Sequence, residues 1–249
     1  MSEEIHVVTV MTGDKYGDEY LNRLYNMVER NLDQPFRFTV FTDRSRPVSP
    51  KIHQVDCSAW GLSGWFNKLR LFDREILPEP FLFFDVTLVI MRPLKPLLDN
   101  IRELGKDICS RRDFRHDEIN SCIMAVRPSE LTQSIWEAYQ KFEHPEDADH
   151  GDQSFTYHTL RRQGKLDELG YLDPALILSY RHLRRLAHED PRAAQEQLKN
   201  AVVLKFHGTP KMSDVLSPLR ALRYSYLKAP LRPLSFAGYL RKEIAEWWR

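Results

Sequence analysis

Short apolar runs alternate with stretches of helical periodicity along most of the chain. The apolar run at residues 5–11 and the alternating segment at 36–43 are each typical of a β-strand. Between them, apolar residues recur at spacings of three and four from Tyr20 to Leu32, which predicts a helix. Strands that alternate with helices predict an α/β fold, in which a mostly parallel central sheet is flanked by helices.

Residues 80–90, with the sequence PFLFFDVTLVI, predict one strand at the centre of that sheet, because the segment is apolar on both faces. The segment 61–72 predicts a glycine-bracketed loop that enters a short helix. That helix would carry Trp65, Leu69 and Phe72 on one face. Further helices are expected at 129–142 and 151–162, and further strands at 51–57, 107–111, 120–126, 174–180 and 201–208.

The chain has no internal repeat and no low-complexity linker, so residues 1–214 are expected to form one domain. Residues 215–249 form a basic, aromatic tail, which suits contact with an anionic membrane surface. Two alternatives remain open for this tail: it packs back on the domain as a helix, or it makes a dimer contact. Its basic residues are Arg220, Arg223, Lys228, Arg232, Arg241, Lys242 and Arg249.

The composition is that of a soluble globular protein, with 42% hydrophobic and 29% charged residues among 249. The net charge of +1 argues against a nucleic-acid partner bound through overall charge. Acidic residues stand at the amino terminus where a signal peptide needs basic ones, and the three cysteines lack metal or redox spacing. We therefore expect a cytoplasmic protein with free thiols, held at the inner face of the membrane if the tail binds lipid.

Polar residues gather where the predicted strands end. Ligands of open α/β sheets bind at the carboxyl ends of the strands, so these positions predict a site. The sequence contains no GxGxxG, GxxxxGK[ST] or GxSxG motif, so dinucleotide, P-loop and hydrolase sites are not indicated. The strand-end residues are Thr42 with Asp43, Asp85 with Thr87, and His207 with Gly208.

The order of several segments resembles glycosyltransferases of the GT-A fold, particularly family-8-like and related bacterial nucleotide-sugar transferases. The resemblance covers residues 5–215 and implies a Rossmann-like single domain. It also implies transfer of a sugar from a nucleotide-sugar, with a UDP-linked donor favoured, to a glycan or glycolipid acceptor. The segments that carry it are VVTVMTGDKYGDEYLNRLYNMVERN, FTVFTD, WFNKLRLF, FLFFDVTLVI, INSCIMAVRPSE, GDQSF, LILSYR and VVLKFHGTPKM.

By this resemblance, Thr12, Thr42 and Asp43 contact the base or ribose of the donor. Lys68 lies near the donor, and Asn120 contacts the donor sugar. Plain alternatives remain open. Thr42 and Asp43 could form a local Asx-type turn, Lys68 could be a solvated helix lysine, and Asn120 could bond loop backbone.

Asp85 matches the first aspartate of the family's Asp-x-Asp motif, and Thr87 stands where the second is expected. Alternate strand residues point the same way, so two carboxylates at this spacing hold one Mn²⁺ or Mg²⁺ that neutralises the diphosphate. A neutral threonine hydroxyl replaces the second carboxylate here, which leaves metal dependence and activity open. By resemblance His207 is a metal ligand, while Gly208 and Lys211 bring a backbone group and an ammonium to the diphosphate.

An alternative is that Lys68 and Lys211 neutralise the diphosphate with little help from a metal. The resemblance places Asp152 and Gln153 on the acceptor side, near the reacting sugar carbon, where they position the substrates. Asp152 could instead be a plain helix N-cap. The rival function is a catalytically inactive GT-A relative that serves as a nucleotide-binding or partner-binding scaffold, and Thr87 is its main support.

Overall fold

In the computed structural model, a mixed sheet of seven strands is the framework of the larger part of the chain. The structure describes residues 4–142, 144, 148–149, 151–217, 240 and 243–248. The chain divides into two compact units. The first unit contains residues 1–22, 34–86 and 98–172, and the second contains residues 23–33, 87–97 and 173–249. The boundary expected after residue 214 stays a prediction.

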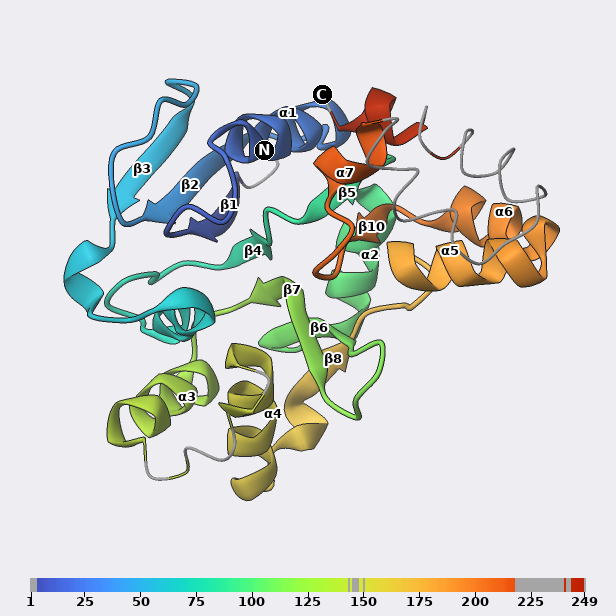
Figure 1. Ribbon diagram of the computed structural model, residues 1–249. Helices are drawn as coiled ribbons and strands as arrows, with labels where there is room; N and C mark the ends of the chain where they lie inside the picture. The colour runs from blue at the N-terminus through green and yellow to red at the C-terminus, as the bar shows by residue number, and fades with distance from the viewer. Residues whose placement is uncertain are drawn as a thin grey trace. The chain divides into compact units, whose positions relative to one another are not determined.

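The sheet of the first unit has the strand order β3-β2-β1-β4-β7-β6-β8. The pairs β1–β2, β2–β3, β1–β4 and β6–β8 are parallel, whereas β7 runs antiparallel to β4 and β6. The expected mostly parallel sheet is therefore confirmed, with β4 at its centre (Figure 1). Its strands are β1 (Ile5–Met11), β2 (Phe36–Thr42), β3 (Ile52–Asp56), β4 (Phe81–Phe84), β6 (Ile108–Arg112), β7 (Ile119–Val126) and β8 (Leu169–Tyr171).

Helices α3 (Glu130–Lys141) and α4 (Asp152–Arg162) lie side by side in the first unit and pack against η2 (Gly64–Phe72) (Figure 1). The Ser129 side chain accepts a hydrogen bond from the backbone of Thr132, which confirms it as the N-cap of α3. The shorter helical turns of this unit are η1 (Ser58–Trp60) and η4 (Leu166–Glu168), and α1 (Glu19–Asn31) and α2 (Lys95–Leu104) each contain residues of both units.

The stripe expected on the helix at residues 64–72 is wrong at one position. Trp65 is 58% exposed, although Leu69 and Phe72 are buried as expected. The segment is a 3₁₀ helix, in which side chains at i and i+3 share a face. Phe66 therefore joins Leu69 and Phe72 against the core, and Trp65 points elsewhere.

The single strand expected at residues 80–90 is also wrong, because the segment contributes to two sheets. Phe81–Phe84 forms β4, and Leu88–Ile90 forms β5 of a sheet in the second unit. The polar residues Asp85 and Thr87 interrupt the apolar run where β4 ends. Periodicity alone does not reveal such a break, since both halves are fully buried.

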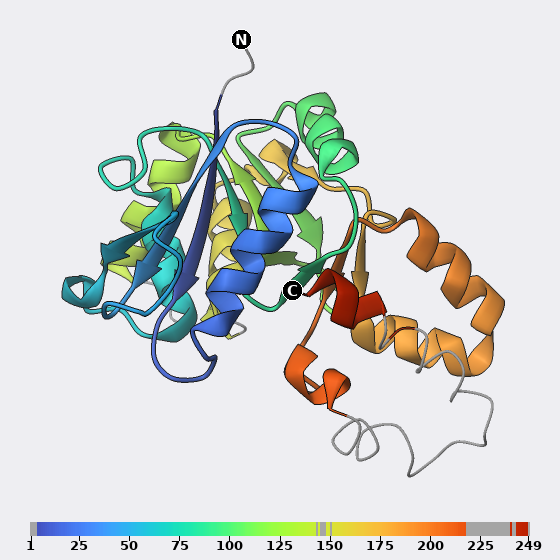
Figure 2. The same ribbon diagram turned by 90° about the horizontal axis from the view of Figure 1, so that it is seen from above.

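The second unit has a three-stranded sheet with the order β5-β10-β9. Strand β10 is antiparallel to β5 and parallel to β9. Helices α5 and α6 lie side by side in this unit (Figure 2). Other elements of the unit include β9 (Ile177–Ser179), α5 (Tyr180–Glu189), α6 (Pro191–Asn200), β10 (Val203–Lys205) and α7 (Met212–Leu216).

The three cysteines, Cys57, Cys109 and Cys122, are free and buried in the first unit. Burial, with the charge of Asp43 as the next cause, raises the pKa of the Cys57 thiol to about 11. Burial likewise raises the pKa of Cys109. The expectation of free thiols is confirmed.

Part of the carboxyl-terminal tail packs against α1 within the second unit. Ile244 and Trp248 are 0% and 3% exposed, and the Arg23 guanidinium lies 3.9 Å from the centre of the Trp248 ring. For these residues the packed-back alternative holds. The basic residues of the tail named above lie outside the part of the chain that the structure describes.

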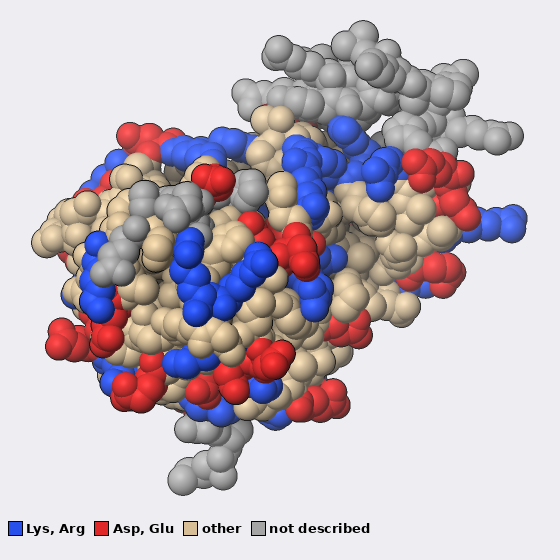
Figure 3. Space-filling view, turned by 90° about the horizontal axis from the view of Figure 1, so that it is seen from below, with Lys and Arg blue, Asp and Glu red and all other residues tan. Residues whose placement is uncertain are grey.

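Both signs of charge are spread over the face drawn in Figure 3, as the near-neutral total leads one to expect. Within the described ranges, no helix combines the length and the apolar character that crossing a membrane requires.

Candidate active site

A buried ion pair joins the start of α4 to η2 in the first unit. The Lys68 ammonium lies 2.7 Å from a carboxylate oxygen of Asp152 and donates a 2.8 Å hydrogen bond to the hydroxyl of Ser121. Lys68 is 8% exposed, and Asp152 and Ser121 are each 3% exposed. Lys68 is therefore not a solvated helix lysine. Asp152 is not the N-cap of α4 either, because Gly151 occupies that position.

Gly151 sets the direction in which the chain enters α4. Its φ of 82° and ψ of −143° lie in a region that only glycine adopts readily. A Cβ at this position would also lie 2.7 Å from the Trp65 ring. The glycine thus places Asp152 in the first turn of the helix, where the helix dipole favours a carboxylate.

A second set of polar side chains meets around Asp113, in the loop between β6 and β7. Asp113 accepts hydrogen bonds from the side-chain amides of Asn120, at 2.5 Å, and Gln153, at 3.4 Å. Burial, the largest single influence, raises the pKa of Asp113. Hydrogen bonds from Asn120, the backbone of Arg115 and His116, and Gln153 outweigh it and lower the pKa overall. Asp113 is therefore a fixed carboxylate acceptor.

These contacts bring four sequence-predicted residues together in the first unit. Two adjacent residues of β7, Asn120 and Ser121, and the first two residues of α4 supply most of the side chains. One strand and one helix therefore position them. We call this group the β7–α4 cluster. It consists of Lys68, Asp113, Asn120, Ser121, Asp152 and Gln153. The sequence reasoning missed Asp113, although two strands around a short loop predict a hairpin that would bring it near Asn120.

The polar residues after β1 and β2 are held together by Arg46, whose side chain is 0% exposed. Its guanidinium donates hydrogen bonds to the hydroxyl of Thr42 and to the carboxylates of Asp18 and Asp43. Asp43 also accepts from the backbone N–H of Gly13. Burial raises the pKa of Asp43, but these hydrogen bonds outweigh it and lower the pKa overall.

Thr42, at 1% exposure, and Asp43 thus fix a loop in the first unit through their own side chains. Asp43 keeps a third of its side chain exposed, and Thr12 is half-buried at the end of β1. A nucleoside contact by these three residues stays a prediction. Sequence reasoning gave no sign of Arg46, because nothing in the sequence marks which arginine is buried.

Asp85 follows β4 and is half-buried, and its backbone N–H donates to the carbonyl of Cys122. Burial and then the charge of Asp85 raise the pKa of the Tyr16 phenol, which stays a neutral donor at physiological pH. Tyr16 is a residue that the sequence did not point to.

In the second unit, the side chain that reaches Thr87 is that of Lys205, the last residue of β10. The Lys205 ammonium donates to the Thr87 hydroxyl, and each residue is 7% exposed. His207 follows two residues later, and its carbonyl accepts a 3.2 Å hydrogen bond from Arg181. Lys211 donates its backbone N–H to Asp214. The predicted residue Gly208 has a φ of +61° and is exposed.

Thr87 offers no carboxylate at the second acidic position, and the expected Mn²⁺ or Mg²⁺ stays a prediction. Over the described residues, no group of three or more His, Cys, Asp or Glu side chains could hold a metal ion. The residue at the second acidic position, Thr87, accepts a hydrogen bond from an ammonium, which repels a metal cation. Of the two predicted ligands, Asp85 belongs to the first unit and His207 to the second.

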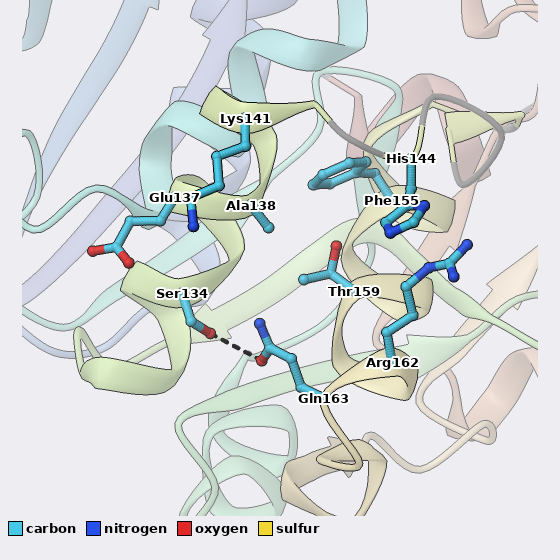
Figure 4. A pocket seen from close by; sticks show the side chains of 9 residues that line it. All are labelled: Ser134, Glu137, Ala138, Lys141, His144, Phe155, Thr159, Arg162 and Gln163. Atoms are coloured by element: carbon cyan, nitrogen blue, oxygen red, sulfur yellow. Dashed lines mark hydrogen bonds between the residues drawn. The ribbon is translucent and has the colours of Figure 1, made fainter.

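A pocket of about 310 Å³ opens between α3 and α4 (Figure 4). Ser134 on α3 bonds Gln163 at one end of it, and the side chains of His144 and Phe155 lie at the other. None of the sequence-predicted site residues lines this pocket. We do not assign the site to it.

Solved structures with similar folds include several glycosyltransferases. The Streptococcus pneumoniae TIGR4 glycosyltransferase GlyE has a TM-score of 0.59 and 13% identity, and the match covers 97% of this chain and 64% of that one. The galactosyltransferase LgtC, solved with donor and acceptor sugar analogues, has a TM-score of 0.54 and 14% identity, covering 98% and 97%. Mouse xyloside xylosyltransferase 1 has a TM-score of 0.53 and 13% identity, covering 84% and 98%.

These similarities show that the fold is that of the GT-A glycosyltransferases, as the sequence predicts. The chain spans 64% of the length of the pneumococcal enzyme and nearly all of LgtC. Comparison of the sequence with protein-family models and with curated proteins finds no match.

Proposed function

We propose that the protein transfers a sugar from a nucleotide-sugar, with a UDP-linked donor favoured, to a glycan or glycolipid acceptor. The observation that carries the proposal is the β7–α4 cluster, which places buried charged and amide side chains together on a GT-A fold. Burying an ion pair and a hydrogen-bonded carboxylate costs stability unless each group is satisfied. Carboxylate and amide side chains such as these can hydrogen-bond the hydroxyls of a sugar.

Within the cluster, each side chain has a role that follows from its chemistry. Asp113 is a carboxylate acceptor for sugar hydroxyls, and the amides of Asn120 and Gln153 supply both donors and acceptors. Asp152, held by Lys68, positions the acceptor beside the reacting carbon. The ammonium of Lys68 holds the carboxylate of Asp152 and the hydroxyl of Ser121 in place.

The remaining predicted residues complete the proposal. Thr12, Thr42 and Asp43 would face the nucleoside. Asp85, with the segment from His207 through Gly208 to Lys211, would lie near the diphosphate.

Donor turnover tests this proposal. Purified protein is incubated with UDP-linked hexoses and a panel of glycan and glycolipid acceptors, and released UDP and product are measured. Gln153→Ala and Asp113→Asn are expected to lower kcat/KM by about a hundredfold, in the range of groups that position a reacting substrate. Arg161→Ala, an exposed change on the same helix, is the matched control and leaves turnover unchanged. Turnover that survives Gln153→Ala and Asp113→Asn would contradict the assigned site.

The second candidate is an inactive GT-A relative that binds a nucleotide or a partner. It is favoured by one observation, the threonine at the second acidic position bonded to a lysine. Calorimetry with UDP, together with the turnover assay, separates the two candidates. UDP binding without turnover of any donor favours the scaffold.

A further inference from the structure

Trp65 lies beside the buried pair of Lys68 and Asp152. Side chains at i and i+3 of a 3₁₀ helix share a face, so Trp65 stands one turn before Lys68 on the same face of η2. Lys68 contacts Asp152, and a Cβ added to Gly151 would lie 2.7 Å from the Trp65 ring. One turn of η2 therefore runs along the start of α4, and the indole is placed next to the β7–α4 cluster.

The Trp65 ring is also open to a ligand. The residue is 58% exposed, although tryptophan is highly buried on average. Among the described residues, Phe142 is the other exposed large hydrophobic residue, and its ring stacks on the buried ring of Phe155. Trp65 packs against the backbone of a glycine instead and leaves more than half of its surface to solvent. It offers an apolar surface at the edge of a polar site.

The size of this surface argues for a small ligand. A tryptophan side chain buries about 250 Å² at most, whereas a stable protein partner covers about 800 Å² on each side of an interface. One exposed ring is too small for such a partner. It is the right size for a single sugar ring, which is flat and carries C–H groups on its faces.

The polar residues nearby complement such a ring. The hydroxyls at the edge of a pyranose can bond the carboxylate of Asp113 and the amide of Gln153, as proposed above. The C–H groups on its face can pack against the electron-rich face of an indole. Because tryptophan has only two side-chain torsions, ordering it against a ligand costs little entropy. Trp65 thus supplies the apolar contact that the β7–α4 cluster lacks.

We propose that the Trp65 indole is the surface on which a pyranose ring of the acceptor stacks, beside Asp152. The acceptor is then a glycan whose terminal sugars pass over the start of α4. This inference rests on the proposed function for the reaction that follows, but the stacking itself requires no turnover and can be measured as binding.

Binding of disaccharides to the full-length protein tests the inference. Lactose, maltose, cellobiose and chitobiose are titrated by saturation-transfer NMR, with and without UDP. At least one is expected to bind, with transfer to its ring C–H protons. Trp65→Ala is expected to weaken that binding at least about tenfold, which equals about 1.4 kcal/mol, and Trp65→Phe much less. Phe142→Ala is the matched control, because Phe142 is exposed but rests on Phe155.

Three results would overturn the inference: no disaccharide binds the wild type, Trp65→Ala binds as tightly as the wild type, or Phe142→Ala weakens binding as much as Trp65→Ala does. A dimer that Trp65→Ala dissociates, seen by analytical ultracentrifugation without sugar binding, would make Trp65 a contact between copies instead. If Trp65→Ala fails to fold, protein labelled with fluorotryptophan decides. The fluorine resonance that Trp65→Phe removes should shift when the disaccharide is added, and an unshifted resonance contradicts stacking.

Failure of the proposed function gives a different result. UDP would not bind and no donor would be turned over, while disaccharide binding that depends on Trp65 remained. Failure of the inference alone would leave donor turnover intact, with the same acceptor KM in Trp65→Ala as in the wild type.

Discussion

Lys68 and Asp152 are two opposite charges that folding removes from water together. Their side chains are 10% and 5% exposed, so solvent screens their attraction little. Desolvation of both charges offsets much of the gain, and such a pair adds little net stability. Removing one partner is different, because the other charge is left buried alone.

Lys68→Met is accordingly expected to lower the free energy of unfolding by about 3 kcal/mol, measured by urea denaturation. Lys106→Met is the matched control. Lys106 forms an exposed pair with Glu168, and its loss is expected to cost less than about 1 kcal/mol.

The double variant Lys68→Met with Asp152→Leu separates stability from function. It should recover much of the lost stability, since no unpaired charge remains, while sugar transfer is expected to be lost. A double variant that transfers sugar at the wild-type rate would show that the pair is only structural.

Gly151 is another residue whose substitution should lower the stability of the first unit. Gly151→Ala combines strain at positive φ with a collision against Trp65, and should lower the free energy of unfolding by about 1–3 kcal/mol. Gly164→Ala, at a φ of +67° with no atom within 4 Å, measures the effect of an alanine at positive φ without a collision. Equal effects of the two variants in urea denaturation would mean that the contact with Trp65 adds nothing to the loss of unfolding free energy.

At the scale of elements, the pairing of β1 with β2 contains a histidine that burial keeps neutral. Burial, followed by the charge of Arg37, lowers the pKa of His6 from 6.5 to about 4. Its ring nitrogen Nε2 lies 2.9 Å from the hydroxyl of Thr39 on β2. Between these two pKa values the unfolded chain binds a proton that the folded chain does not.

Stability should therefore fall as the pH drops from 6.5 to about 4. Tm measured by differential scanning calorimetry should decrease through this window by about 2–4 °C for each kcal/mol lost. His6→Gln, which does not titrate, should show a shallower decrease. Parallel curves for the two proteins would remove His6 as the cause.

Elements with long, regular patterns could be predicted from the sequence, and those decided by tertiary contacts could not. The strands at 5–11 and 36–43 and the helix at 129–142 follow from periodicity and, for the helix, from its Ser129 cap. The break between β4 and β5 does not, since a buried strand reads the same in either sheet. The 3₁₀ helix of η2 shifts the apolar period from 3.6 to 3 residues, which misplaced Trp65.

The residues of the candidate site also divide into those that the sequence predicts and those that only tertiary contacts reveal. Lys68, Asn120, Asp152 and Gln153 were found because the resemblance names their positions in short segments. Asp113 was missed because its importance comes from side chains that reach it across a hairpin and from α4. Arg46 and Lys205 were not predicted either, because only tertiary contacts reveal which cation is buried.

At the scale of the whole molecule, charge is divided unevenly along a nearly neutral chain. Residues 215–249 carry seven basic and two acidic residues, a net of +5, which leaves −4 for residues 1–214. Each Lys or Arg near an anionic bilayer contributes about 1 kcal/mol of attraction at low salt. Trp248 does not take part, because it is buried against α1.

The protein should therefore co-sediment with vesicles containing phosphatidylglycerol and be released by raised salt, while neutral phosphatidylcholine vesicles leave it in the supernatant. Arg220→Gln with Arg223→Gln should weaken the sedimentation. Equal sedimentation with both lipids, or with neither, would favour a tail that only packs on the protein.

Alkylation of the three buried thiols can be used to follow the unfolding of the first unit. Only a thiolate reacts with alkylating reagents, so Cys57, Cys109 and Cys122 are shielded by burial while the first unit is folded. The second unit has no cysteine, because these three are all that the sequence contains. Pulsed alkylation therefore measures the unfolding of the first unit and gives no signal from the second. Comparing it with hydrogen exchange over the whole chain shows whether the two halves unfold as one cooperative body or in separate steps.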